Sequence, residues 1–179
     1  MTYEVMSKVL DNGCKVVVSY DPDPQSPREW DNVGTIVLWN QARNHSFGEE
    51  TADREALLEM ENDKSLIWLP IYLYDHSGIA INTTGFSCRW DSGQVGLIYC
   101  TKEKAVQEFG KKICTAKVRA WALKCLEGEI KDLDQYLRGN VYMVTVFDPQ
   151  GKEIHSCAGY YGDADYCMSE GESFVKHCY

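Results

Sequence analysis

Alternating apolar and polar positions near the two ends of the chain predict two β-hairpins. Apolar runs at residues 3–10 and 14–20 flank an Asn-Gly pair at residues 12–13, and Asn-Gly between two such runs is a strong hairpin signal. Runs at residues 141–147 and 152–160 flank a turn that contains Pro and Gly. Both pairs are therefore expected to be antiparallel.

The middle of the chain mixes buried strands with helices. Apolar runs predict strands at residues 33–39, 66–74, 79–83 and 95–101, whereas residues 40–50 are polar and loop-like. Capping residues and helical spacing predict helices at 51–62, 101–110 and 115–128, a further turn at 132–137 and a frayed helix in the tail from residue 163. This order indicates an α+β fold in a single domain, with a largely antiparallel sheet and two or three helices on one face.

Composition agrees with one globular domain. Hydrophobic residues are 44% and charged residues 25% of the 179 residues, which are ordinary values. The apolar stretch at residues 67–73 is too short to span a bilayer, and residues 1–4 show no secretory signal. Eight cysteines are present without a Cys-x-x-Cys pair, so reduced thiols are expected rather than a structural zinc site. The sequence therefore predicts a cytoplasmic protein with no membrane partner and no cofactor.

Charge is distributed unevenly over the chain. The net charge is −9, yet residues 102–124 hold seven basic and two acidic side chains, a local charge of +5 that leaves −14 elsewhere. An acidic surface suits a basic partner, including a protein that itself binds nucleic acid. Plain solubility explains the same acidity. The candidate partner-binding residues are Asp21, Asp23, Glu29, Asp31, Glu49 and Glu50.

The basic segment offers a candidate phosphate site. Lys111, Lys112, Lys117 and Arg119 would bind phosphate if they share a face of the predicted helices. The alternative is a solvated helix surface, because nucleic-acid-binding domains are usually more basic than this chain.

Two short polar segments hold the most unusual chemistry. Asp75-His76-Ser77-Gly78 and, some fifteen residues later, residues 88–94 each follow a strand-like run and combine carboxylate, hydroxyl and glycine. Each could be a tight turn. In the functional alternative, His76 is a general base or metal ligand oriented by Asp75, and Asp91 joins Asp75 in a carboxylate pair that binds a divalent cation. Asp75 and Asp91 are expected at one end of the sheet.

Two further residues could join this chemistry, although the known motifs are absent. Asp31, beside Trp30, adds a third aromatic–carboxylate pair, and His45 adds a loop histidine. The sequence contains no P-loop, dinucleotide fingerprint or His-Glu-x-x-His, and Ser77 and Ser92 lack a nucleophile-elbow context.

Several motifs together resemble a family of small proteins from bacteriophages and integrated mobile elements. The resemblance covers roughly residues 28–162. Arg89 departs from the family pattern, in which proline often precedes the tryptophan. The motifs are Trp-Asp-Asn-Val-Gly-Thr at residues 30–35, Trp-Leu-Pro at 68–70, Tyr-Leu-Tyr-Asp-His-Ser-Gly at 72–78, Phe-Ser-Cys at 86–88, Trp-Asp-Ser-Gly-Gln-Val-Gly at 90–96 and Asp-Gln-Tyr-Leu at 134–137.

A phage origin implies a counter-defence role. Small acidic phage proteins without catalytic motifs often block a host defence enzyme, and type II anti-CRISPR proteins inhibit the RNA-guided effector nuclease, whose channel is positively charged. The first hypothesis is therefore an anti-CRISPR-type inhibitor that acts in the host cytoplasm by binding the effector nuclease or its nucleic-acid complex. The alternative is a metal-assisted phosphodiester hydrolase that uses Asp31, Asp75, His76 and Asp91.

Overall fold

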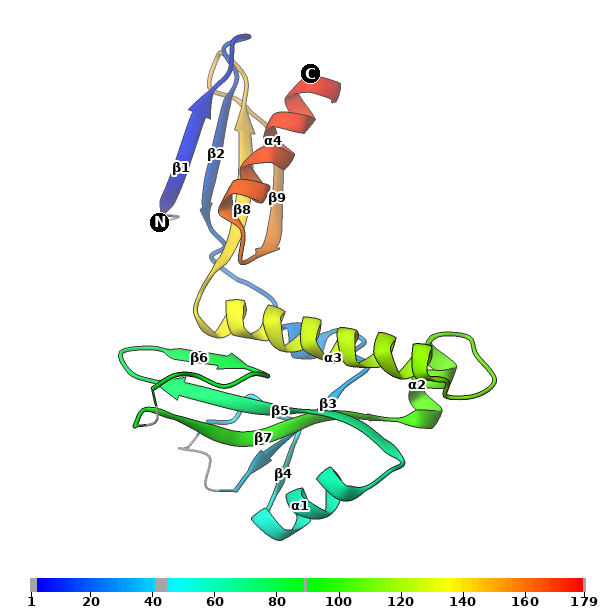
Figure 1. Ribbon diagram of the computed structural model, residues 1–179. Helices are drawn as coiled ribbons and strands as arrows, with labels where there is room; N and C mark the ends of the chain where they lie inside the picture. The colour runs from blue at the N-terminus through cyan, green and yellow to red at the C-terminus, as the bar shows by residue number, and fades with distance from the viewer. Residues whose placement is uncertain (1–2, 41–44, 89, 179) are drawn as a thin grey trace. The chain divides into compact units, whose positions relative to one another are not determined.

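In the part of the chain that the structure describes, two largely antiparallel β-sheets and four α-helices form the α+β fold that the sequence predicts (Figure 1). The structure is a computed structural model, and it describes residues 3–40, 45–88 and 90–178. These residues cluster into two compact units: a terminal unit, Met1–Ser26 with Gln135–Tyr179, and a central unit, Pro27–Asp134. The single-domain organisation stays a prediction, because two such units can belong to one domain.

The terminal unit is a four-stranded sheet with one helix packed on it. Both predicted hairpins are confirmed, and their strands pair antiparallel in the order β1-β2-β8-β9. Helix α4 covers a core that includes Val16, Val144 and Val175, and Asp163 caps it by accepting a hydrogen bond from the Tyr166 amide at 2.9 Å. Its elements are β1 Glu4–Val9, β2 Lys15–Tyr20, β8 Val141–Phe147, β9 Glu153–Tyr161 and α4 Ala164–Cys178.

The central unit contains the second sheet, with strand order β4-β3-β7-β5-β6. All of its pairings are antiparallel except β3 with β4. Strand β4 spans the boundary between the predicted loop at residues 40–50 and the predicted helix at residues 51–62, and neither prediction includes a strand there. It is only three residues long and polar, so it carries no apolar alternation. The strands are β3 Thr35–Trp39, β4 Glu50–Ala52, β5 Leu66–Asp75, β6 Ile79–Asn82 and β7 Ser92–Thr101, and a 3-10 turn, η1, spans Pro27–Glu29.

Helices cover both faces of this second sheet. Helix α1 (Arg54–Asn62) packs Leu57 against Val37 and Leu97, whereas helix α3 (Ala116–Leu137) runs along the opposite face (Figure 1). Helix α2 (Lys102–Glu108) follows β7 directly and is capped by the Thr101 hydroxyl, which accepts from the Lys104 amide at 3.1 Å. The prediction of helices on one face only is therefore wrong for this unit.

Helix α3 is longer than its sequence predicts. The expected end at Gly128 is wrong, because the helix continues to Leu137 and absorbs the predicted turn at residues 132–137. Buried side chains at Leu126, Ile130 and Leu133 keep one apolar face in register through the glycine. Their burial outweighs the cost of glycine in a helix, which is about 1 kcal/mol. The predicted cap of α1 also moves, from Thr51 to Asp53, whose carboxylate accepts from the Ala56 amide at 2.8 Å.

Among the described residues, no helix is long and apolar enough to cross a membrane.

All eight cysteines are free thiols, as predicted. Cys100 and Cys167 are buried, and burial raises the pKa of the Cys100 thiol to about 11 and that of Cys167 to about 12.

Candidate functional site

The first polar segment forms the hairpin loop between β5 and β6. Asp75 is the last residue of β5 and pairs with Ile79, so His76, Ser77 and Gly78 make a three-residue loop. Ser77, rather than the glycine that commonly takes this position in a turn, adopts the left-handed conformation, with φ of 60°. A non-glycine residue in that region is unusual and costs roughly 1–2 kcal/mol. The loop therefore holds one strained residue directly beside His76.

The second polar segment meets the first, as predicted. Strands β5 and β7 are antiparallel neighbours, and Tyr74 pairs with Ser92. The Asp75 amide donates a hydrogen bond to the Asp91 carbonyl at 2.9 Å, so both carboxylates lie at the same end of the sheet. Ser92 and Gly93 belong to β7, so no turn forms at Gly93.

Each of these carboxylates has a histidine beside it. His45 Nε2 lies 3.2 Å from Asp75 Oδ2, and His76 Nδ1 lies 3.6 Å from Asp91 Oδ2. The Cys88 thiol donates to Asp91 Oδ2 at 3.5 Å. The Asp75 and Asp91 side chains are each 37% exposed, so the cluster is open to solvent. The arrangement pairs each acid with one base, and His76 is oriented by Asp91 rather than by Asp75.

Asp31 does not join this cluster. Thr35, at the start of β3, pairs with Tyr99 near the far end of β7, and Lys104 of α2 donates to the Asn32 carbonyl at 2.8 Å. Asp31 therefore lies near the Thr101 end of β7, whereas Asp91 precedes its Ser92 end. Ten residues of strand separate these ends, or about 30 Å. Across the part of the chain that the structure describes, no three His, Cys, Asp or Glu side chains gather so as to hold a metal ion.

One predicted partner-binding acid has an internal role instead. Glu49 Oε1 accepts from Arg28 Nε at 2.6 Å, and its Oε2 accepts from the Ile36 amide at 2.6 Å. Arg28 also donates to Glu129 of α3 at 2.9 Å. Burial alone would lower the pKa of Arg28, but its bonds and charge pairing with the two glutamates raise it overall. This triad, Glu49–Arg28–Glu129, joins the segment before β3 to α3 and to the segment before β4.

The other predicted acids are distributed over both units. Asp21 belongs to the terminal unit and accepts from the Asp23 and Gly159 amides at 3.0 and 3.2 Å. Asp23 lies in the same loop, whereas Glu29 and Glu50 belong to the central unit. Asp23, Glu29 and Glu50 are exposed, so they remain candidate contact residues.

Helix α1 presents an acidic face within the acid-rich segment at residues 49–63. Glu55, Leu58, Glu59 and Asn62 are spaced at i, i+3, i+4 and i+7, which places them on one side of the helix, opposite the buried Leu57. All four are exposed, and Leu58 keeps 49% of its surface accessible. The acidic segment is evident in the sequence, but the arrangement of Glu55 and Glu59 around Leu58 follows from the helix.

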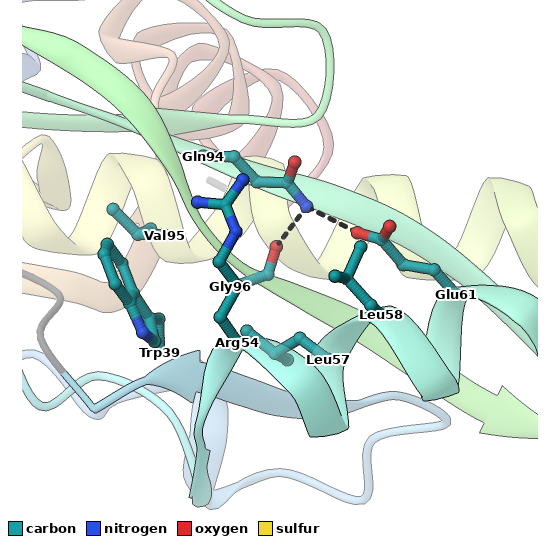
Figure 2. Close-up of a pocket in the computed structure, with 8 residues that line it drawn as sticks. All are labelled: Trp39, Arg54, Leu57, Leu58, Glu61, Gln94, Val95 and Gly96. Atoms are coloured by element: carbon teal, nitrogen blue, oxygen red, sulfur yellow. Dashed lines mark hydrogen bonds between the residues drawn. The ribbon is translucent and has the colours of Figure 1, made fainter.

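A hollow of about 300 Å³ lies between α1 and the sheet (Figure 2). Val95 and Gly96 of β7 form its base, Trp39 stands on one side, and Arg54 and Glu61 extend from the helix. The hollow is therefore apolar at its base and polar at its rim.

Gln94 reaches this hollow because β7 bulges. Ile71 of β5 pairs with Gly96, but Tyr72 pairs with Gln94, so Val95 is the extra residue. A bulge re-aims the neighbouring side chains. Gln94 Nε2 can then donate to Glu61 Oε1 at 2.9 Å, as Figure 2 shows.

The predicted phosphate-binding residues divide into two places. Lys111, Lys112 and Lys117 line one hollow of about 250 Å³ near Trp121. Arg119 lies elsewhere, because its guanidinium donates to the Leu66 carbonyl at 3.5 Å. Arg119 therefore does not meet the condition of a face shared with the three lysines.

The cluster around Asp75 and Asp91 includes His45 and Cys88, whose positions the sequence did not predict. His45 lies thirty residues before Asp75 on a polar loop, and no spacing links the two. Cys88 belongs to a quoted motif but had no assigned contact. Arg89, noted as a departure from the family pattern, lies outside the described residues.

Comparison with known proteins adds no relative. No family model matches this chain, and no curated protein or solved structure matches it. The resemblance to small phage proteins therefore stays a prediction.

Proposed function

We propose that this chain is a counter-defence protein of a bacteriophage or mobile element, and that it inhibits a host nucleic-acid-processing enzyme by binding it. The partner class that suits it best is an RNA-guided effector nuclease, whose nucleic-acid channel is positively charged. The family resemblance and the acidic charge support this class. The contact surface we assign is the exposed face of α1.

The observation that carries the proposal is an acidic helix face with an apolar centre. Glu55 and Glu59 flank Leu58, which is 49% exposed. Interfaces commonly combine an apolar centre with a charged rim, and the rim charges guide association with an oppositely charged partner. The hollow beside Leu58 (Figure 2) provides space for a side chain of the partner.

The internal contacts of the other acids narrow the choice of surface. Glu49 is held by Arg28 and the Ile36 amide, and Asp53 caps α1. Neutralising them would disturb the fold as well as any interface. Glu55 and Glu59 are exposed helix-surface charges, whose removal changes stability by less than about 1 kcal/mol.

The test is inhibition of target cleavage by a guide-loaded type II effector nuclease. The chain is expected to slow cleavage, and the variant E55Q/L58A/E59Q is expected to lose at least tenfold in potency. The control E153Q/E170Q removes two exposed charges from the terminal unit and should keep the parent's potency. Equal potency of all three proteins would reject the α1 surface, and no inhibition by any of them would reject this partner class.

The paired acids and histidines favour a second candidate, a phosphodiester hydrolase. A carboxylate can orient a histidine that acts as a general base, and Asp91 Oδ2 lies 3.6 Å from His76 Nδ1. Asp75, His76 and Asp91 do not form a three-ligand metal site among the described residues, so this candidate would need an ion to draw their side chains together. The test is hydrolysis of a chromogenic phosphodiester with Mg²⁺, Mn²⁺, Ca²⁺ or Zn²⁺, together with the melting temperature, which a bound ion raises. Activity that disappears in H76Q would support this candidate, and its absence with all four ions would reject it.

A further inference from the structure

Three lysines converge at the segment that joins α2 to α3. Lys111, Lys112 and Lys117 line the hollow of about 250 Å³, and all three are exposed. The ammonium of Lys117 lies 4.8 Å from the centre of the Trp121 ring, and that of Lys111 lies 5.8 Å from it. Two cations are thus gathered at one aromatic ring.

The arrangement lacks an acidic counterpart. Within the described ranges, the ion pairs of the protein involve other cations, and none joins a carboxylate to these three lysines. Like charges that converge repel one another, and an anion between them relieves that repulsion. The hollow is therefore complementary to a negatively charged group.

The rim of the hollow is apolar as well as cationic. Ile113 keeps 69% of its surface exposed and lines the hollow with Trp121. Phe109, the residue that follows α2, lies against the Trp121 ring, with centroids 5.5 Å apart, and supports it. Proteins that bind single strands combine cationic groups for the backbone with apolar and aromatic surfaces for unstacked bases. A duplex hides its bases and would leave Ile113 without a contact.

We infer that this hollow binds the phosphate backbone of a single-stranded nucleic acid, with Lys111, Lys112 and Lys117 on the phosphates and Ile113 beside a base. This hollow and the α1 face are separate surfaces, and different variants test them. The inference also extends the proposed function, since an enzyme loaded with nucleic acid would offer a basic protein surface to α1 and a nucleic-acid strand to the lysines.

The experiment measures fluorescence anisotropy of a labelled single-stranded 20-mer titrated with the whole protein. Three phosphate contacts predict that the logarithm of the binding constant falls with the logarithm of the salt concentration with a slope of about −2. K111Q/K112Q/K117Q should bind at least tenfold more weakly with a flatter slope. The control K124Q/K131Q/K152Q removes the same charge from exposed positions and should stay within threefold of the parent.

Two further arms separate this inference from general electrostatic attraction. I113S should weaken binding of the single strand severalfold while leaving binding of inorganic polyphosphate unchanged. A duplex of the same sequence should bind more weakly than the single strand. Equal losses in the two lysine variants, duplex binding as tight as that of the single strand, or no binding at low salt would each overturn the inference.

Discussion

The two units differ in what holds their elements together. In the terminal unit, α4 packs valine, cysteine and methionine side chains on the sheet. Most of the acidic side chains of α4 are exposed to solvent. In the central unit, carboxylates from α3 enter the framework: Glu129 accepts from the Val33 and Gly34 amides at 2.8 and 3.1 Å, and the buried Asp134 accepts from the Ile81 amide at 2.8 Å. An acidic composition therefore has two uses here. Some acids hold the central unit together, and only the exposed ones are available to a partner.

The largest expected effect comes from a methyl group added at a close backbone approach. A Cβ on Gly96 would lie 2.1 Å from the Val37 carbonyl oxygen, so β3 and β7 would have to separate. We expect G96A to lose more than about 3 kcal/mol of unfolding free energy and to weaken every interaction of α1. Denaturant melts measure this.

The matched change in the terminal unit is G171A. There a Cβ would lie 2.5 Å from Val16 Cγ1, and side chains can shift more easily than a strand backbone. A loss of about 2 kcal/mol is expected, with nuclease inhibition retained by the folded fraction. Loss of inhibition in folded G171A would contradict the assignment of function to the central unit.

The triad Glu49–Arg28–Glu129 gives the next largest effect. R28M leaves two carboxylates near each other without their cation. A buried pair broken in this way costs about 3–5 kcal/mol, and partial exposure of Glu49, 36%, should reduce this to about 2 kcal/mol. A thermal melt compares R28M with R138M, which changes an arginine of the terminal unit. Equal melting temperatures would show that the triad does not hold the central unit together.

Cys100 of the central unit and Cys167 of the terminal unit are buried thiols with raised pKa values, and the two should respond alike to alkaline pH. The pKa of Cys100 is raised to about 11 and that of Cys167 to about 12, both chiefly by burial, against 9.0 for a solvated thiol. The unfolded state therefore loses its proton first. The stabilising contribution is complete below pH 9 and is lost as the pH rises toward 11 or 12. Each tenfold difference in proton affinity between the folded and unfolded states corresponds to at most about 1.4 kcal/mol of this loss.

Alkylation at pH 8 provides the measurement for the thiols. Exposed Cys157 and Cys178 should react quickly, and Cys100 and Cys167 only upon unfolding. The variant C100V should flatten the alkaline loss of stability. Rapid labelling of Cys100 in the folded protein would contradict its burial.

The smallest effect concerns the strained loop beside His76. S77G places glycine at φ of 60°, where it has no Cβ penalty. A gain of about 1 kcal/mol is expected, read as a higher melting temperature. An unchanged or lower melting temperature would show that the loop stores no such strain.

The sequence predicted elements with a local signal and missed those set by tertiary packing. Hairpin turns, caps and strand ends placed Asp75 beside Asp91, because antiparallel neighbours bring the end of one strand to the start of the next. Helix α3 passed through Gly128 because its apolar face continues on both sides. The pairing of His45 with Asp75 and the internal role of Glu49 depend on contacts between distant segments, and no local spacing encodes them.

The association rate of the protein with the guide-loaded nuclease, measured at two salt concentrations, decides whether the acidic face of α1 makes the contact. If it does, E55Q/E59Q should associate at least about fivefold more slowly than the parent at low salt, and the difference should shrink as salt screens the charges. The control E153Q/E170Q should match the parent. Association of E55Q/E59Q at the parent's rate, with no dependence on salt, would show that this face is not the interface.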